Sequence, residues 1–599
     1  MDFRKIAVFF FLLTITVSKA QENDVKANIE MDFFGNLYLD VSLPSIDLKK
    51  DTLIIDDDIL IHKNYASLIG GVRINGSYLI NYKPKDKDLS YVINLPKNSA
   101  NSYVKKADYF FTFINYLPSQ KQNFNKEKKF DITFNFPKKL KVVYPDSTDL
   151  TKKFITTPPI IAGDFVESEI EGFKVLNLKK DNKHKNGIEK VMMVVKDAYD
   201  FYQLRYPKKE SKPKIIFLPF EGPLGGRTIR DAIVFDSSIL NDTITLEKRL
   251  IAHEVAHLWW GFYGVNFDNQ YLIEGIAEYM SLKYMEYKKE TEYVKKSINK
   301  KHYHIEGLAD GSEILSVKRR STEENGRLSY DFAPLLFFNV EKDNNNLYDV
   351  LSEFYKLNEA NKGSISISRL DSFLKKNKLS PLVTESILPD YFFIEDGEKL
   401  ILKGINFTKN KKIDIEFTDN SDLKKNKTYS FSSKMNEYVF YKKDIKKAII
   451  DPEYKVLQFS RLNDTWANNN TSVFSKNRYF PIEEIKPEVL TQSEKMLDYL
   501  FSKNNVTIQD VTCEDNLWLI EKIDKLKNEI NKMEGVTITG ASTLFKIGRK
   551  NQDRIDVKAS IFSKKENTSK FIYFYLYYDK SLKYLQNFKL ESELNDAEE

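Results

Sequence analysis

Two histidines and a glutamate stand close together in the segment LIAHEVAHLWWG, residues 250–261 of this 599-residue chain. His253 and His257 are four residues apart, so a helix would place both imidazoles on one face, one turn apart. Glu254 would point towards the same side, while apolar residues fill the other faces and bury the helix. Buried imidazoles need a partner, and a metal ion supplies one. The spacing therefore predicts a metal centre, and the alternative is a pair of core histidines satisfied by other hydrogen bonds.

A third ligand is expected nearby, because a catalytic zinc site has three protein ligands and one position open for water. The candidate is Glu274, in the segment QYLIEGIAEYMSLKYME, which has the apolar pattern of a second helix. Gly275 follows it and leaves room for close helix packing. Glu278 would lie one turn further on, on the same face. It either accepts a hydrogen bond from the far nitrogen of a ligating histidine or is a solvated or helix-pair charge.

These motifs are similar to those of a known family of metallopeptidases. His-Glu-x-x-His-x-Trp-Trp-Gly, followed by Leu-x-Glu-Gly-x-Ala-x-Tyr, resembles the gluzincin family of aminopeptidase N and leukotriene hydrolase. The resemblance implies that His253, His257 and Glu274 bind one catalytic Zn²⁺ ion and that Glu254 is the general base. In such a site zinc lowers the pKa of water and polarises the scissile carbonyl, and the glutamate passes the water proton to the leaving amine. The implied partner is a peptide or protein substrate.

The resemblance also implies a tyrosine that stabilises the oxyanion of the tetrahedral intermediate. Tyr330 stands 56 residues past Glu274 in the segment RLSYDFAPLLFFNVEK, and Ala333 occupies a position where a small residue is expected. The Lys-Gly pair that accompanies this tyrosine in the family is missing here. The chain contains 34 tyrosines, so another one remains an alternative. We predict Tyr330 as the second catalytic residue.

The loop between the second histidine and the third ligand is shorter than in the family. Sixteen residues, 258–273, separate His257 from Glu274, where the family has 18. The shortening falls in the turn GFYGVN, and a shorter surface turn need not move either helix. Glu274 is therefore retained as the predicted ligand.

The segment that would hold the amino end of a substrate departs further from the family pattern. Aminopeptidases of the family carry Gly-x-Met-Glu-Asn before the zinc helix, whereas this chain has GPLGGRTIRDAIVF. Gly225 and Gly226 could let a substrate backbone approach. Arg227 or Arg230 would repel an α-ammonium and favour a carboxylate or a continuing peptide. Alternatively, both arginines face solvent or pair with Asp231.

The interpretation that follows is an exported zinc metallopeptidase, an enzyme that is aminopeptidase-like in its chemistry. One alternative is an endopeptidase of the same fold that lacks free-amine recognition. Another is a catalytically silent, zinc-stabilised scaffold that binds a peptide or a protein partner. The intact Glu254 argues against the scaffold, because a structural zinc needs ligands but no general base.

The length of the chain predicts several domains, since one hydrophobic core does not grow to this size. Period-two alternation marks the first part of the chain and recurs after the helices, whereas a helical period marks the middle. We expect a multidomain α+β protein, and its predicted parts are an N-terminal antiparallel β domain over 21–165, a thermolysin-like α/β peptidase domain over 166–382 (implied by the resemblance), a small β-sandwich over 383–465, a linker over 466–484 and a small α+β module over 485–599.

The N-terminus has the pattern of a secretory signal over residues 1–20, with Arg4 and Lys5 before a short apolar stretch and Ala20 at the expected cleavage site. The apolar stretch is too short to span a bilayer, so no stable membrane span is expected. The protein is therefore expected in the periplasm, on the cell surface or in the medium. The single cysteine, Cys513, excludes an intramolecular disulfide. A net charge of +6 from 92 basic and 86 acidic residues gives no case for nucleic acid as a partner.

Overall fold

The protein is described by a computed structural model. The described residues are 25–31, 37–44, 53–56, 71–74, 77–82, 88–93, 98–99, 102–105, 109–112, 117, 119–120, 128–154, 157–179, 185–219, 225–241, 244–261, 264–305, 326–341, 346–359, 365–382, 388–406, 410–454, 456–468, 472–476, 485–502, 505–512, 516–533, 535–546, 552–579, 582 and 585–590. The predicted signal segment and Cys513 lie outside these residues.

The contacts between residues divide the chain into two compact units, and the division passes through helix α5 (Gln270–Tyr287). The first unit consists of Met1–Ile273, Met280–Lys289 and Asp349–Arg369. The second unit consists of Glu274–Tyr279, Glu290–Tyr348 and Leu370–Glu599. Several separate sheets and helical layers make this a multidomain α+β protein, as the sequence predicts.

The N-terminal part of the first unit consists of three sheets, with strand orders β13-β11-β1-β2-β6, β10-β3-β5-β4 and β12-β14-β9-β8-β7. Inward and outward positions alternate along β1, where Val25, Ala27 and Ile29 are buried, as expected of a strand with one face on a core. The expectation of purely antiparallel strands is wrong at one place, because β1 runs parallel to β11. The strands are β1 (Val25–Met31), β2 (Leu37–Ser42), β3 (Leu53–Asp56), β4 (Gly71–Ile74), β5 (Ser77–Tyr82), β6 (Asp88–Ile93), β7 (Asn98–Ser99), β8 (Ser102–Lys105), β9 (Tyr109–Thr112), β10 (Ser119–Gln120), β11 (Lys128–Asn135), β12 (Lys141–Tyr144), β13 (Lys153–Phe154) and β14 (Ile160–Gly163).

A mixed five-stranded sheet with the order β15-β16-β17-β19-β18 follows in the first unit. Its three central strands are parallel and almost fully buried, as expected where helices cover a parallel sheet. The segment GPLGGRTIR contains the edge strand β18, because its backbone pairs with β19 despite the two glycines. The strands are β15 (Phe165–Ile170), β16 (Phe173–Leu178), β17 (Lys214–Leu218), β18 (Gly226–Ile229) and β19 (Ala232–Asp236).

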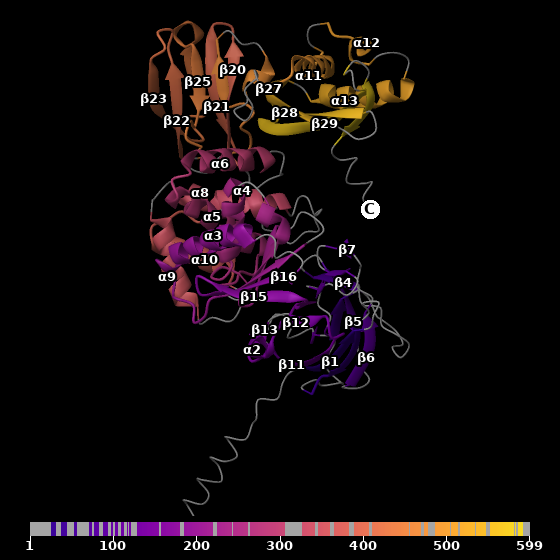
Figure 1. The fold of residues 1–599 in the computed structure, drawn as a ribbon. Coiled ribbons are helices and arrows are strands. Elements are labelled where there is room, and N and C mark those ends of the chain that lie inside the picture. The colour runs from indigo at the N-terminus through magenta and orange to yellow at the C-terminus, as the bar shows by residue number, and fades with distance from the viewer. Residues whose placement is uncertain are drawn as a thin grey trace, which may run out of the picture. The chain divides into compact units, whose positions relative to one another are not determined.

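Helices α3 (Lys185–Gln203) and α4 (Ile244–Ala256) lie to one side of this sheet (Figure 1), and the HEVAH motif lies at the C-terminal end of α4. The hydroxyl of Tyr202 on α3 donates to the carbonyl of Ala252 on α4 at 3.0 Å. The indole N–H of Trp259 donates to the carbonyl of Pro207 at 3.0 Å. Buried hydrogen bonds of this kind fix the position of α4, because breaking one would leave a desolvated polar group. The other helical segments are α2 (Ser147–Leu150), η3 (Ser237–Asn241), α6 (Thr291–Ile305), η5 (Leu328–Phe332), α8 (Ala333–Glu341), α9 (Leu347–Asn358) and α10 (Ile367–Lys376).

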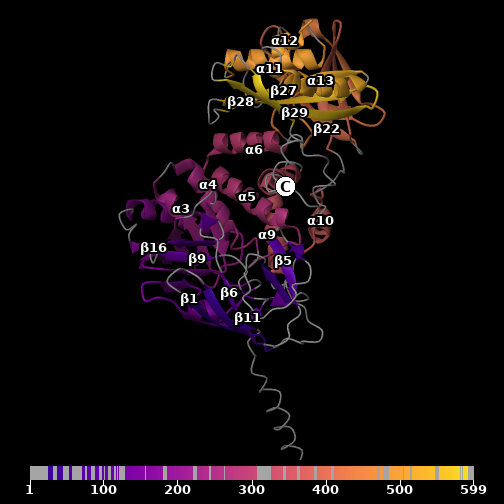
Figure 2. The same ribbon diagram turned by 90° about the vertical axis from the view of Figure 1, so that its right-hand side faces the viewer.

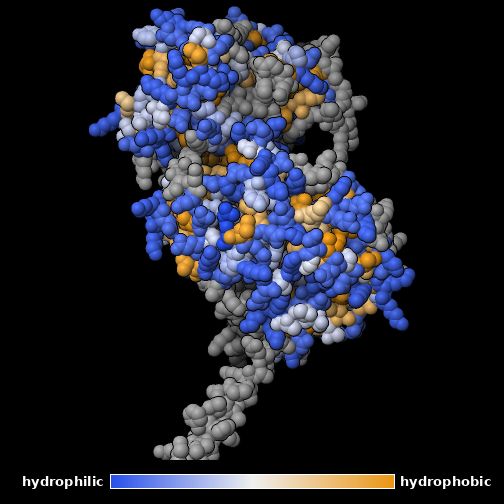
Figure 3. Space-filling model, turned by 60° about the vertical axis from the view of Figure 1, so that its left-hand side comes forward, coloured by the Kyte–Doolittle hydropathy of each residue, from blue (hydrophilic) through white to orange (hydrophobic). Residues whose placement is uncertain are grey.

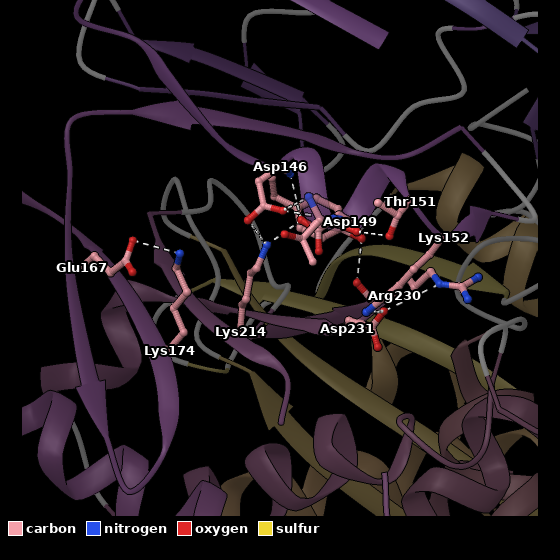
Figure 4. Close-up of polar contacts among 11 residues, drawn as sticks. Asp146, Asp149, Thr151, Lys152, Glu167, Lys174, Lys214, Arg230 and Asp231 are labelled. Carbon is pink, nitrogen blue, oxygen red and sulfur yellow. Dashed lines mark hydrogen bonds and ion pairs between the residues drawn. The ribbon is translucent and has the colours of Figure 1, made fainter. Parts of the chain in front are cut away.

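An ion-pair cluster joins α2 to the mixed sheet within the first unit (Figure 4). The ammonium of Lys214 lies 2.6 Å from carboxylate oxygens of both Asp146 and Asp149, and Asp149 is buried. Lys152 pairs with Asp231 at 2.8 Å beside the β18–β19 turn. A buried charge is tolerated only when it is paired, so this cluster fixes α2 against the start of β17.

The second unit contains a β-sandwich whose two sheets have the orders β20-β21-β24 and β23-β22-β25-β26. Side chains from both sheets form one core, with Phe393, Leu402, Ile415 and Phe431 among them. The predicted boundary at 465 falls inside β26, which pairs with β25. The elements are β20 (Asp390–Asp396), β21 (Lys399–Ile405), β22 (Lys411–Thr418), β23 (Lys424–Phe431), β24 (Glu437–Tyr441), η6 (Lys442–Asp444), β25 (Lys447–Ile450) and β26 (Thr465–Ala467).

The C-terminal part of the second unit is an α+β module in which α11, α12 and α13 lie on one face of an antiparallel sheet, β27-β28-β29-β30 (Figure 2). The core of the module includes Leu519, Val557 and Phe574. Phe474 also lies in this core, although it belongs to the segment predicted as a linker. The elements are η7 (Val473–Lys476), α11 (Pro487–Leu500), α12 (Ile508–Val511), α13 (Leu517–Lys532), β27 (Val536–Lys546), β28 (Gln552–Ser563), β29 (Thr568–Asp579) and β30 (Leu585–Leu590).

A buried polar network lies where the sandwich meets this module. Asp390 is fully buried and accepts hydrogen bonds from the hydroxyl of Ser569 and, at 3.3 Å, from the amide of Asn463. The rings of Phe392 and Phe562 pack 5.0 Å apart beside this network. The two parts therefore share an interface with an ionisable group inside it.

Replacing Asp390 by asparagine is expected to stabilise the protein more at pH 8 than at pH 5. Burial raises the pKa of Asp390 to about 7 from an ordinary value of 3.8. The folded chain therefore holds a proton that the unfolded chain releases, and stability falls as the pH rises through this range. Relative to acidic solution, in which the carboxyl is protonated in both states, the shift costs roughly 4 kcal/mol of folding stability at pH 8. Less than half of that loss has occurred at pH 5. Thermal unfolding at the two pH values measures the difference, and an equal gain at both would contradict it.

Hydrophilic side chains cover most of the described surface on the face drawn in Figure 3, and hydrophobic ones form small, scattered patches. This distribution agrees with a charged fraction of 30%. Within the described ranges, none of the helices combines the length and the hydrophobicity that a membrane span requires.

Candidate metal centre

The two histidines of the HEVAH motif face each other at the end of α4. The helix ends at Ala256, but the N–H of His257 still bonds the carbonyl of His253 at 3.3 Å, so the helical spacing is kept. The Nε2 atoms of the two rings lie 3.1 Å apart, and the ring planes are nearly perpendicular at 87°. His253 is 4% exposed. The predicted placement of both imidazoles on one face of a buried helix agrees with this geometry.

Glu274 completes a group of three potential ligands. One ligand atom from each of His253, His257 and Glu274 lies within 4.8 Å of the other two. Two nitrogens bound to one tetrahedral zinc ion would lie about 3.3 Å apart, since each Zn–N bond is about 2.05 Å long. The observed separation of 3.1 Å between the two Nε2 atoms fits this value. Two imidazoles and one carboxylate are also a donor set that zinc accepts in catalytic sites.

The orientation of His257 is fixed by a hydrogen bond at its second ring nitrogen, Nδ1. Its Nδ1 atom lies 2.9 Å from the carbonyl oxygen of Trp260, so Nδ1–H donates to that carbonyl and Nε2 keeps its lone pair for a metal. Trp260 is fully buried, and its ring lies in edge contact with Tyr206 and Tyr355. The second tryptophan of the motif thus holds the carbonyl that selects the tautomer of His257.

The turn between the two ligand-bearing helices is compact. The N–H of Val265 bonds the carbonyl of Trp259 at 2.8 Å, which folds the chain back immediately after the motif. A Cβ atom at Gly264 would lie only 1.9 Å from that same carbonyl, so only glycine fits there. Asn269 then caps α5 by accepting from the N–H of Tyr271 at 3.0 Å. The turn of sixteen residues is therefore long enough to bring Glu274 to the histidines.

The segment that carries Tyr330 packs tightly against α5. A Cβ atom at Gly275 would lie 2.3 Å from the Cβ atom of Ala333, so both positions require small side chains. Tyr330 lies in η5, a π-helical turn, and is 44% exposed, while Leu328 and Phe332 are buried. π-Helical turns within helices occur frequently at functional sites. The glycine at 275 and the small residue expected at 333 therefore allow α5 and this segment to pack closely.

Glu254 is held by the edge strand of the mixed sheet. The hydroxyl of Thr228 on β18 lies 2.8 Å from Oε2 of Glu254 and 2.6 Å from its backbone carbonyl, so its one proton can be donated to either. A Cβ atom at Gly226 would lie 2.8 Å from Cγ of Glu254, which explains a glycine where β18 crosses the helix. Glu254 is buried, so its orientation depends on this strand.

Replacing Thr228 by valine, which keeps the shape but removes the hydroxyl, is expected to lower turnover about tenfold. The loss corresponds to one hydrogen bond to a charged group. Thr228→Ser keeps the hydroxyl and should retain most of the activity. Steady-state kinetics of both variants provides the measurement, and equal losses in the two would count against a role for the hydroxyl.

The other residues predicted on this segment take different places. A Cβ atom at Gly225 would lie 2.4 Å from a methyl carbon of Leu250, so this glycine also serves the contact with α4. Arg227 lies on β18 and is partly buried. Arg230 lies over the ring of Phe154 and 3.7 Å from the carboxylate of Asp231, the pairing foreseen as the alternative to a substrate contact.

Glu278 has a partner on another helix. Its Oε1 atom accepts a hydrogen bond from the buried ammonium of Lys301 on α6 at 2.7 Å, and Glu278 itself is 1% exposed. It is thus a buried, paired charge rather than a solvated one. The carbonyl of Trp260, and not Glu278, lies against the far nitrogen of His257. A hydrogen bond from His253 to Glu278 stays a prediction.

Comparisons with known proteins add little to this site. No protein-family model matches the chain, and no curated protein matches it. One similar solved structure is the M60 catalytic domain from Clostridium perfringens ZmpC in complex with the sialyl T antigen, at 10% identity and a TM-score of 0.25, covering 73% of this chain and 92% of that chain.

Sequence reasoning missed three groups that support the site. Thr228, Lys301 and the carbonyl of Trp260 each contact one of the predicted site residues. None of them belongs to a spacing pattern, because each contact is made across the fold or through the main chain. A threonine on the segment before α4 was visible in the sequence, but nothing there indicated where its hydroxyl would lie.

Proposed function

We propose that this protein is an exported zinc metallopeptidase of the gluzincin type that hydrolyses peptide bonds. The observation that carries the proposal is the convergence of His253, His257 and Glu274, whose ligand atoms lie within 4.8 Å of one another. The carboxylate of Glu254, hydrogen-bonded by Thr228, supports it, since a purely structural zinc needs no such group. When bound, zinc lowers the pKa of water towards neutrality and polarises a carbonyl.

The residues around the site have separate tasks in this reaction. Glu254 takes a proton from the attacking water and delivers it to the leaving amine. Thr228 limits the motion of that carboxylate, so the proton is accepted at a fixed place. Tyr330 donates its phenolic hydrogen to the oxyanion of the tetrahedral intermediate, for which its exposed side chain is suited.

The aminopeptidase-like reaction is the first candidate, and an endopeptidase reaction is the second. The endopeptidase is favoured by one observation: β18 has Arg227 in the segment where the resembled family has its amine-binding glutamate. A guanidinium there disfavours the α-ammonium of a free peptide end and tolerates a chain that continues. Peptides are the substrate class in both cases.

Matched peptides with free and acetylated N-termini separate the two candidates. An aminopeptidase releases single residues from the free peptides and leaves the acetylated ones intact. An endopeptidase cleaves both at the same internal bond. Mass spectrometry of the products reads out both outcomes, and the absence of cleavage in every peptide would refute hydrolysis altogether.

Export is part of the proposal and is supported by the basic, apolar and small-residue pattern of residues 1–20. The protein would then act in the periplasm, at the cell surface or in the medium. N-terminal sequencing of protein recovered outside the cytoplasm should begin at Gln21. A mature chain that begins at Met1 would contradict this.

A further inference from the structure

A buried lysine that no motif indicates contacts the main chain of Tyr330. Lys301 lies on α6, and its side chain is 9% exposed. Its ammonium donates to Oε1 of Glu278 at 2.7 Å and to the backbone carbonyl of Tyr330 at 2.6 Å. One charged group thus joins the helix of the third ligand to the main chain of the predicted oxyanion donor.

The surroundings of Lys301 strengthen this bridge. The carboxylate of Asp331 lies 3.9 Å from the ammonium, and Nδ1 of His304 lies 3.1 Å from the same carboxylate. Glu278 is nearly inaccessible to solvent, so water cannot replace the ammonium there at low cost. The cluster connects η5 to α6. The close packing of Gly275 and Ala333, the residue that follows η5, keeps the end of η5 against α5.

The turn η5, which Lys301 contacts, has π-helical hydrogen bonding. The N–H of Ala333 bonds the carbonyl of Leu328, five residues back, which widens the turn and shifts the helical hydrogen-bond pattern. The carbonyl of Tyr330 bonds a side chain from another helix. The main chain of Tyr330 is therefore fixed by a charge-assisted hydrogen bond, while the residue as a whole is exposed.

We propose that Lys301 is a positioning residue for catalysis, which sets the phenol of Tyr330 relative to Glu274 through its bonds to Glu278 and to the Tyr330 carbonyl. The inference rests on the proposed peptidase function, in which Tyr330 donates to the oxyanion. Glu274 and Glu278 are one helical turn apart on α5, so the bridge connects a metal ligand to the donor in a few contacts. A displacement of about 1 Å at such a donor costs up to about 100-fold in rate.

The test combines Lys301→Met with Tyr330→Phe in a double-mutant cycle. Lys301→Met alone should lower kcat about 10- to 100-fold while KM and zinc content stay near the wild-type values. In the Tyr330→Phe background the same change should cost less than about twofold, because the group that it positions is already gone. Losses that multiply in the double variant would overturn the proposal.

Three further variants control for folding and for charge. Lys300→Met removes an exposed lysine next to Lys301 on α6 and should change nothing. Lys301→Arg keeps a charged donor and should recover part of the lost kcat. If Lys301→Met does not fold, Lys301→Met with Glu278→Leu replaces both buried charges by apolar groups of similar size and serves in its place. Full activity of the variant used would also overturn the proposal.

Hydrogen exchange provides a measurement that needs no turnover. In the metal-free protein, Lys301→Met should speed amide exchange in residues 326–341, and Lys300→Met should not. Unchanged exchange would refute the attachment of η5 by Lys301. Failure of the wild-type protein to cleave any peptide would refute the proposed function. If the wild type cleaves peptides but the kcat losses of the two single variants multiply in the double variant, only the positioning role is refuted.

Discussion

Replacing Glu254 by glutamine is expected to abolish peptide hydrolysis while zinc stays bound. Glutamine has nearly the same shape but cannot take a proton from water, so the general-base step is lost. The loss should be at least about 1,000-fold, in the upper part of the range for a positioned acid–base group. The candidate ligands are His253, His257 and Glu274, and this substitution leaves all three in place.

Zinc content and turnover must be measured on the same preparation. Metal analysis of Glu254→Gln should give one zinc per chain, as in the wild type. The conservative variant Thr228→Ser is a suitable control, because it alters the neighbour of Glu254 but keeps a hydroxyl. Turnover by Glu254→Gln at the wild-type rate would refute the mechanism.

Replacing Glu274 by glutamine is expected to remove both zinc and activity. A neutral amide oxygen is a much weaker zinc ligand than a carboxylate, and the site then keeps only two histidines. The affinity for zinc should fall by more than about 100-fold, because changes outside the ligand set already cost 10- to 100-fold. Competition with a chromogenic chelator measures the affinity directly.

A matched variant on the same helix distinguishes ligand loss from helix damage. Glu286 lies on α5 and pairs with Lys283 near the surface, so Glu286→Gln should keep zinc and activity. Wild-type zinc affinity in Glu274→Gln would show that another residue is the third ligand, despite the convergence of the three side chains.

The parts of the site that were predictable are those that depend on local spacing. His253 and His257 are neighbours by helical geometry alone, and Glu274 follows from a short turn and a second helix. The spacing of these three residues, and the room that Gly275 leaves beside Glu274, need only one or two consecutive elements of the chain. The small residue at 333 was implied by the family resemblance alone, and it meets Gly275 from a helix much further along the chain.

The parts that were not predictable depend on contacts made by the folded chain. Thr228 reaches Glu254 only because a glycine-rich segment pairs with β19 as an edge strand, against its local preference for a loop. The parallel pairing of β1 with β11 joins strands about one hundred residues apart, which no alternation pattern specifies. Nothing in the sequence distinguishes Lys301 from the other lysines of α6, because its buried partners come from other elements of the fold.

The most direct test of the central claim is the metal dependence of peptide cleavage. Purified protein is incubated with a defined peptide mixture before chelation, after chelation and after Zn²⁺ is added back, and the peptides are compared by mass spectrometry. We predict new fragments with the native protein, none after chelation, and the same fragments again with Zn²⁺. Bound zinc with an unchanged peptide mixture in all three samples would contradict the account and favour a scaffold that only binds.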